Sequence, residues 1–243
     1  MTEEGALTSQ QIVIVGGSSG IGLATARRLV ARGAEVTAVG RNPEKLQCAR
    51  ETTPGLRTAQ VDARSRSALD EFFRALPRLD HLVVAASGGR GAGGFLELPL
   101  EDLQSGFEGK VWTQLAAVQS GGQVLNSTGS ITLVGAGSSR MSAPGTAGLA
   151  AINGALDALV TPLAVELAPR RVNLVAPGVI DTEWWRWLDP EARRETFASY
   201  AARTPAGRVG QPDEVAHAIV FLIENAFMTG AILECDGGLR LRS

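Results

Sequence analysis

The chain has 243 residues, of which 44% are hydrophobic and 20% charged, a composition typical of one sizeable globular α/β domain. Its net charge of −2 at pH 7, with no basic block, argues against a nucleic-acid or anionic-membrane surface. Residues 1–10 are polar, do not resemble a secretion signal and are expected to form a flexible tail, and no apolar stretch is expected to span a membrane. Cys48 and Cys235 have no metal-binding spacing and predict no disulfide framework, which favours a cytoplasmic location.

Strand patterns and helix patterns alternate along residues 11–243, separated by short turns. This order predicts a single Rossmann-like domain: a doubly wound parallel sheet of about seven strands with helices on both faces. The predicted strands are Gln11–Val15, Glu35–Val39, Arg57–Val61, His81–Ala85, Ser130–Val134, Arg171–Val175 and Ala231–Cys235. The predicted helices are Gly20–Ala31, Pro43–Glu51, Ser65–Ala75, Leu100–Gln119, Thr146–Leu167 and Pro212–Asn225, and a further helical pattern over 181–204 is expected at the periphery.

A glycine-rich turn joins the first predicted strand to the first predicted helix. Glycines in such a turn let the backbone approach a pyrophosphate, and the helix N-terminus supplies N–H groups and a partial positive charge. Any tight strand–helix turn would also select small residues, but the position directly after a strand favours dinucleotide binding. We therefore expect the cofactor to contact this turn through Gly16, Ser18, Ser19, Gly20, Ile21 and Gly22.

The residues after the second predicted strand indicate which cofactor is bound. An acidic residue there would bind both ribose hydroxyls of NAD, whereas a cation favours the 2′-phosphate of NADP. The chain has Arg41 there and no carboxylate, and a guanidinium makes paired, charge-assisted contacts with a phosphate. We therefore expect NADP(H), the alternative being that Arg41 is a surface residue beside a helix cap.

From about residue 10 to the C-terminus the chain resembles the short-chain dehydrogenase/reductase family. Besides the glycine turn, the matching motifs are Val61-Asp62, Ala176-Pro177-Gly178 followed by Thr182, and Asp236-Gly237-Gly238. In that family the aspartate contacts the adenine, and the Pro-Gly segment with its threonine borders the nicotinamide. Taken singly, the aspartate could be a solvated loop carboxylate and the Pro-Gly pair an ordinary turn. The resemblance implies further cofactor contacts for Asp62, Ala63, Ala86, Pro177, Gly178 and Thr182.

The catalytic half departs from the family pattern. Members that follow the standard scheme use a tyrosine as proton donor, a lysine four residues later that lowers its pKa, and a serine that orients the carbonyl. Aligned on the Gly129-Ser130-Ile131 strand start, this chain has Ala136 at the serine position, Leu149 at the tyrosine position and Asn153 at the lysine position. A small slip in register would let Ser138 or Ser139 replace the serine. No slip supplies a tyrosine, because Tyr200 is the only one.

Lys110 stands where the family has an asparagine that supports a water relay, so lysine and asparagine have exchanged positions between two neighbouring helices. One interpretation is that the ammonium group is retained near the cofactor and acts as proton donor or electrostatic stabiliser. The alternative is that Lys110 extends to solvent and Asn153 only bonds backbone. The candidate catalytic residues are therefore Lys110, Asn153 and Ser138, and no metal site is expected.

Residues 181–204 are expected to cover the substrate. The run Trp184-Trp185-Arg186-Trp187 suits a small apolar or aromatic substrate, although such a cluster also suits a subunit contact. The residues favour an oxidoreductase acting on a carbonyl, imine or enone with a non-standard proton source. A catalytically silent nucleotide-binding partner or redox sensor, or a non-redox enzyme, remains open. The resemblance implies a homodimer or homotetramer formed through the Leu100–Gln119 and Thr146–Leu167 helices.

Overall fold

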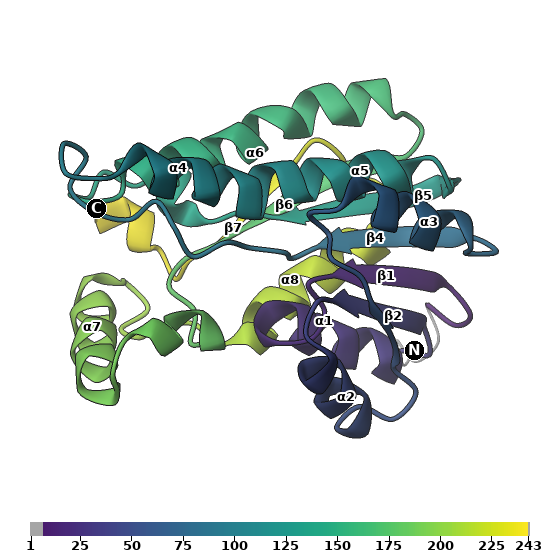
Figure 1. The fold of residues 1–243 in the computed structure, drawn as a ribbon, viewed down its shortest axis with the longest axis horizontal. Helices are drawn as coiled ribbons and strands as arrows, with labels where there is room; N and C mark the ends of the chain where they lie inside the picture. The colour runs from purple at the N-terminus through teal and green to yellow at the C-terminus, as the bar shows by residue number, and fades with distance from the viewer. Residues whose placement is uncertain (1–6, 243) are drawn as a thin grey trace.

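The computed structural model describes residues 7–242 and contains a seven-stranded sheet in the order β3-β2-β1-β4-β5-β6-β7 (Figure 1). Every neighbouring pair of strands is parallel. The predicted Rossmann-like sheet is confirmed. Its strands are β1 (Gln11–Val15), β2 (Glu35–Gly40), β3 (Arg57–Gln60), β4 (Leu79–Val84), β5 (Leu125–Val134), β6 (Arg171–Pro177) and β7 (Ile232–Cys235).

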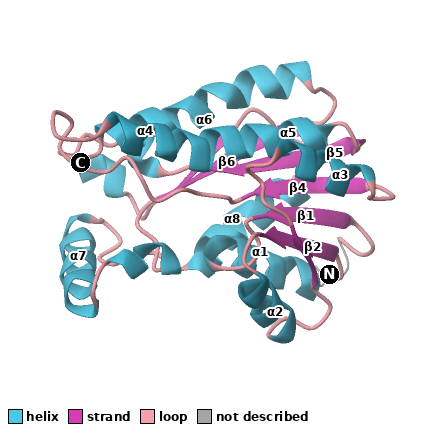
Figure 2. Cartoon of the chain, in the orientation of Figure 1, coloured by secondary structure: helices cyan, strands magenta, loops and turns pink. Residues whose placement is uncertain are grey.

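Helices cover both faces of the sheet, each over its own hydrophobic core (Figure 2). One face carries α1 (Gly20–Ala31), α2 (Pro43–Glu51) and α8 (Pro212–Glu224). The other carries α3 (Arg66–Arg74), α4 (Leu100–Phe107), α5 (Thr113–Gly122) and α6 (Ala147–Glu166). The strand order reverses between β1 and β4, and in such sheets the crevice at the carboxyl ends of the two strands is the usual ligand site.

The predicted helix Leu100–Gln119 is wrong in one respect, because a π-helical turn over Glu108–Trp112 separates α4 from α5. The Thr113 hydroxyl bonds the carbonyl of Glu108, five residues earlier, at 2.8 Å. Gly109 also lies against the loop after β4, since a Cβ on Gly109 would come within 3.1 Å of the Cα of Gly88. Such turns are rare and are frequently found at functional sites, and Lys110 lies in the middle of this one.

The segment 181–204 forms two helical pieces beyond the carboxyl ends of the strands, a 3₁₀ turn over Glu183–Trp187 and α7 (Pro190–Arg203) (Figure 1). Asp189 begins α7 by accepting hydrogen bonds from the backbone N–H groups of Glu191 and Ala192, with Pro190 in the first turn. No residue of α7 is buried, in agreement with the predicted peripheral position.

Two expectations about apolar segments need correction. Of the predicted tail, residues 1–6 lie outside the described residues, whereas Leu7 is 2% exposed and the backbone N–H of Ser9 donates to the carbonyl of Gly33 at 3.2 Å.

Helix α6 is long and apolar enough to cross a membrane by length and composition, with a mean hydropathy of 1.5 over 18 residues. It packs on the sheet through Ile152, Leu156 and Val160, as a core helix does.

Candidate active site

The glycine turn is built to place a helix N-terminus beside an anion. Gly16 has φ +86, and a Cβ on Gly22 would lie 2.2 Å from the carbonyl oxygen of Gly16, so neither position accepts a larger residue without movement. Ser19 occupies the N-cap of α1, but its side chain makes no cap hydrogen bond, and the first turn of α1 has no acidic residue. The N–H groups at the start of α1 therefore have no side-chain partner there and fit a pyrophosphate.

Two residues predicted to bind the adenosine half follow β2 and β3. Arg41 is exposed, and no ion pair is found for it among residues 7–242. Asp62 is held by Arg64, whose Nε and Nη2 lie 3.0 and 2.6 Å from its carboxylate oxygens. Hydrogen bonding to Arg64 lowers the pKa of Asp62, so the carboxylate is fixed in place at neutral pH. The charge of Arg41 also contributes to this lowering of the Asp62 pKa.

The nicotinamide end of the predicted site lies where β6 ends. A Cβ on Gly178 would come within 2.8 Å of the Cα of Asp236, so the Pro177-Gly178 backbone packs tightly on the chain after β7. The methyl group of Thr182 lies 3.4 Å from a Cβ built on Gly20, which closes the glycine turn from this side. The predicted cofactor residues therefore all lie at the carboxyl edge of the parallel sheet: Gly16, Ser18, Ser19, Gly20, Ile21, Gly22, Arg41, Asp62, Ala63, Ala86, Pro177, Gly178 and Thr182.

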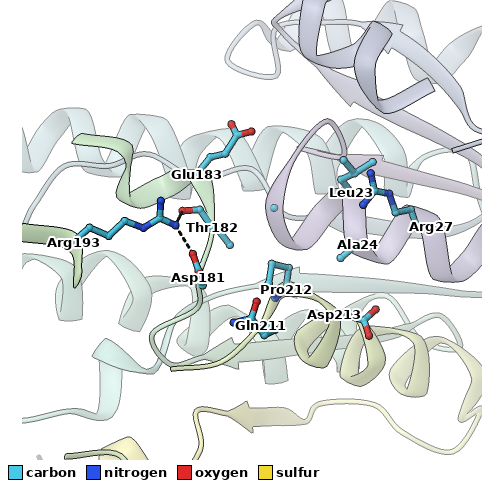
Figure 3. Close-up of a pocket in the computed structure, with 11 residues that line it drawn as sticks. Leu23, Ala24, Arg27, Asp181, Thr182, Glu183, Arg193, Gln211, Pro212 and Asp213 are labelled. Atoms are coloured by element: carbon cyan, nitrogen blue, oxygen red, sulfur yellow. Dashed lines mark hydrogen bonds and ion pairs between the residues drawn. The ribbon is translucent and has the colours of Figure 1, made fainter. Parts of the chain in front are cut away.

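A cleft of about 580 Å³ opens beside this edge, on the α1 side of Thr182 (Figure 3). Its walls come from α1, from the start of α8 and from the segment after β6. Arg193 reaches from α7 to bond Asp181 on its rim, as Figure 3 shows. The candidate catalytic residues Lys110, Asn153 and Ser138 are not among the described residues that line this cleft.

Lys110 is the cation of the candidate site whose pKa departs most from its ordinary value. Its side chain is buried, with 7% of the residue exposed, and its Nζ donates to the carbonyl of Gly135 at 3.0 Å. Burial lowers the pKa of Lys110 from 10.5 to about 8, while the negative charge of Asp157 opposes the shift. Lys110 therefore does not extend to solvent. Its ammonium group lies at the end of β5, one residue before Ala136 at the standard serine position.

Asn153 and Ser138 come together, as a clamp between α6 and the 3₁₀ turn Gly137–Arg140. Asn153 Nδ2 donates to Ser138 Oγ at 3.1 Å and to the carbonyl of Leu149 at 2.8 Å. Ser138 Oγ in turn donates to the same carbonyl at 3.4 Å, and Ser139 Oγ turns back to the carbonyl of Ala136 at 3.2 Å. Both candidate serines thus bond backbone carbonyls. Asn153 Oδ1 is buried and has no hydrogen-bond partner, so this acceptor fits a donor group of a bound ligand.

The aromatic residues of the segment 181–204 pack on one another. The Trp185 ring contacts Trp184 at a centroid distance of 4.7 Å, Phe197 at 5.6 Å and Tyr200 at 6.1 Å. Tyr200 is therefore part of this cluster, with Arg203 over its ring at 4.8 Å. Trp184 Nε1 donates to the carbonyl of Gly88 at 3.4 Å, which ties the segment to the loop after β4.

Comparison with known proteins identifies the family. Residues 15–240 match the family described as Enoyl-(Acyl carrier protein) reductase. The zebrafish (Danio rerio) protein Carbonyl reductase family member 4 is 34% identical, over 96% of this chain and 99% of its own length. The chain belongs to the short-chain dehydrogenase/reductase family.

Two further members of this family are informative. The Escherichia coli (strain K12) protein named Cyclic-di-GMP-binding biofilm dispersal mediator protein is 34% identical, over 96% of this chain and 98% of its own length. A crystal structure described as a small-chain dehydrogenase in complex with NADPH superposes with a TM-score of 0.84. That protein is 30% identical and the match covers 96% of this chain and 99% of the other.

Sequence reasoning missed three polar residues near the dehydrogenase/reductase site. Gln114, one helical turn after Lys110, donates from Nε2 to the carbonyls of Ala86 at 3.2 Å and Val134 at 3.0 Å, and so joins the ends of β4 and β5. Asp157 and Arg140 form an ion pair of 3.2 Å beside Lys110. The only sequence indication for Gln114 was a polar residue within an apolar helix pattern, and none existed for the Asp157–Arg140 pair.

Proposed function

We propose that this chain is an NADP(H)-dependent oxidoreductase in which Lys110 replaces the usual tyrosine as proton source. The observation that carries the proposal is a buried ammonium group at the carboxyl end of β5, one residue before the position of the missing serine. The pKa of this group, about 8, lies near neutral pH, where an acid is most effective as a catalyst. NADPH, when bound, supplies the hydride.

The residues around the glycine turn fit NADP(H). The start of α1 would hold the pyrophosphate, because its N–H groups lack a side-chain cap. The exposed guanidinium of Arg41 would bind the 2′-phosphate. The NADPH complex of the structural relative supports this choice. Asn153 Oδ1 would accept a hydrogen bond from a hydroxyl of the bound cofactor or substrate, because it has no partner in the protein.

Lys110 holds the proton at Nζ. In the ammonium form it donates to Gly135 and stabilises negative charge that develops on the acceptor atom beside Ala136. Giving up a proton, directly or through a water molecule, leaves a neutral amine that its apolar surroundings favour. The loss of the phenol disfavours simple ketones, so the preferred acceptor is an imine or an enone, whose one proton can come from water, from Lys110 or from a nearby serine.

The acceptor is a small apolar or aromatic molecule, and the segment 181–204 covers it. Trp184 lies against the loop after β4 through its bond to Gly88, so an indole faces the end of the sheet near the proposed acceptor position. Trp187 is 63% exposed and provides further aromatic surface, with Arg186 beside it for a negatively charged substituent.

The test is a titration with NADPH and NADH followed by hydride transfer to a panel of ketones, imines and enones. We expect Lys110→Met to retain NADPH binding and to lower turnover by about 10²-fold or more, the usual contribution of a general acid. Arg66→Met, which removes an exposed cation of α3, is the control and should leave turnover unchanged. Equal turnover of the Lys110→Met variant and the parent protein would refute the role of Lys110.

A second candidate function is a silent nucleotide-binding module. It is favoured by Leu149, which brings no exchangeable proton to the standard tyrosine position, and by the burial of Lys110. The Escherichia coli relative, whose name describes ligand binding, is a precedent for such a role. Tight NADPH binding without turnover across the whole panel would establish it.

We propose that the protein is a homodimer or homotetramer. The outer face of α6 is apolar and carries Val165 at 80% exposure, and Trp112 at the end of the π turn is 62% exposed. Burial of these side chains against a second copy would remove them from water. Sedimentation analysis tests this, since Trp112→Glu is expected to shift the parent oligomer towards monomer.

A further inference from the structure

The inner side of α6 brings a line of charged groups toward Lys110. Asp157 lies four residues after Asn153, so both side chains lie on the same face of α6, which packs against the π turn. The Asp157 side chain is 12% exposed. Its Oδ2 forms an ion pair with Arg140 Nη2 at 3.2 Å, while its Oδ1 is buried and has no hydrogen-bond partner.

Arg140 continues the line to β7. Its Nη1 donates to Glu234 Oε1, and the second oxygen of Glu234 is again buried without a partner. Two carboxylates therefore share one guanidinium, which leaves a net charge of −1 within a region of low solvent access. One further cation would make the group neutral, and the charge of Asp157 acts on the buried ammonium of Lys110.

Two other polar groups lie close to Lys110 in the fold or in the chain. From the end of β5 it meets the carbonyl of Gly135. Glu108, on the same π turn, acts on Arg64 instead. Among the described residues, Asp157 is the charged group that raises the pKa of Lys110 against the effect of burial.

We propose that Asp157 is a positioning residue that keeps Lys110 protonated and directed toward the end of β5. An opposite charge within a few ångströms favours the charged form of an ionisable group, and a desolvated ammonium depends on it most. Arg140 pairs with Oδ2 of Asp157 and competes with Lys110 for the negative charge, while Oδ1 has no hydrogen-bond partner among the described residues. The inference rests on the proposed function only for its catalytic consequence, because the effect on Lys110 itself is independent of turnover.

The chain suits a direct test, because it contains only two lysines, Lys45 and Lys110. Protein labelled with ¹³C and ¹⁵N in lysine gives two ammonium-bearing side chains to follow by NMR, and Lys110→Met assigns them. We expect Asp157→Asn to lower the pKa of Lys110 by about 1 or more, a tenfold change in proton affinity. Glu224→Gln, which removes a carboxylate paired with Arg32 on the opposite face of the sheet, is the matched control and should not move it.

A second variant is expected to shift the pKa of Lys110 in the opposite direction. Arg140→Gln removes the cation beside Asp157, so the pKa of Lys110 is expected to rise. If Asp157→Asn fails to fold, the pKa of Lys110 in Arg140→Gln tests the proposed effect of Asp157. A pKa of Lys110 that stays unchanged in either folded variant, or that moves as much in Glu224→Gln, overturns the proposal.

The pH profile of turnover separates this inference from the proposed function. If protonated Lys110 is the acid, turnover falls as pH rises through its pKa, and in Asp157→Asn the fall moves to lower pH by the amount seen by NMR. A shifted pKa with an unshifted turnover profile would uphold the positioning role of Asp157 and refute Lys110 as proton source. A profile that moves while the NMR titration does not would refute the positioning role alone.

Discussion

Burial of the Lys110 ammonium group makes the stability of the protein depend on pH in a specific window. The pKa of Lys110 is about 8 in the folded chain and 10.5 ordinarily, so between these values the unfolded state binds more protons than the folded state. The free energy of unfolding therefore rises as pH rises through this window. Between pH 7 and pH 9.5 the expected gain is about 2 kcal/mol, taking 1.36 kcal/mol for each pKa unit.

Lys110→Met isolates this gain, because methionine has a similar length and does not titrate. Urea unfolding followed by circular dichroism, at a fixed protein concentration, gives the unfolding free energy of both proteins at the two pH values. The bond of the ammonium group to Gly135 helps to set the pKa of Lys110, so its loss is already included in the expected pH dependence. We expect wild type to gain about 2 kcal/mol on Lys110→Met as pH rises from 7 to 9.5.

The control is Lys45→Met, which removes the other lysine, a partly exposed one paired with Glu183. Its pH dependence should run parallel to that of wild type. If Lys110→Met also runs parallel to wild type, within about 0.5 kcal/mol, Lys110 does not titrate as a buried ammonium. The proposal that it supplies the proton near neutral pH would then lose its physical basis.

Three other predictions concern the cofactor turn and the sheet. Gly22→Ala places a Cβ against the carbonyl of Gly16 and should weaken NADPH binding at least tenfold, as measured by fluorescence titration. The control is Gly154→Ala, which has open space around the new Cβ; it should leave NADPH binding intact and stabilise α6 by up to about 1 kcal/mol. Arg41→Gln should weaken NADPH roughly tenfold or more and leave NADH unchanged, since only NADPH loses a charge-assisted bond. Burial lowers the pKa of His81 to about 4, so between pH 6.5 and pH 4 the folded state binds fewer protons than the unfolded state. The unfolding free energy of wild type should therefore fall by about 2 kcal/mol relative to that of His81→Gln between pH 8 and pH 5. Equal losses in the two proteins would contradict this.

The parts of the fold that were predictable from the sequence depend on local patterns. The run Gln11–Val15, the glycine turn and the helix Gly20–Ala31 appear as predicted, because an apolar strand, a turn that needs small residues and an amphipathic helix are each encoded in consecutive residues. The parallel order of the strands follows from the alternation of strands and helices. Arg41 directly follows β2, because the extent of that strand is also encoded in consecutive residues.

The catalytic half depends on contacts that no local pattern records. The π turn at Lys110 accompanies the contact of Gly109 with Gly88, which comes from another element. Whether Lys110 reaches solvent or stays buried depends on how α6 packs over it, so the sequence left both interpretations open. The network at Asp157 joins residues that are up to 94 positions apart, and its charges become meaningful only once they are buried together.

The exchange of lysine and asparagine between positions 110 and 153 is coupled by charge. The pair of carboxylates at Asp157 and Glu234, with Arg140 between them, leaves a single negative charge, and one buried ammonium balances it. A lysine at position 153 in addition to Lys110 would bury a second cation with no carboxylate left to compensate it, at a cost of several kcal/mol. Asparagine avoids this cost, because its amide is neutral and its Nδ2 finds two acceptors within the clamp. Lys110 and Asn153 therefore belong together. Because Lys110 supplies the ammonium group from the π turn, the residue at position 153 on α6 has to be neutral.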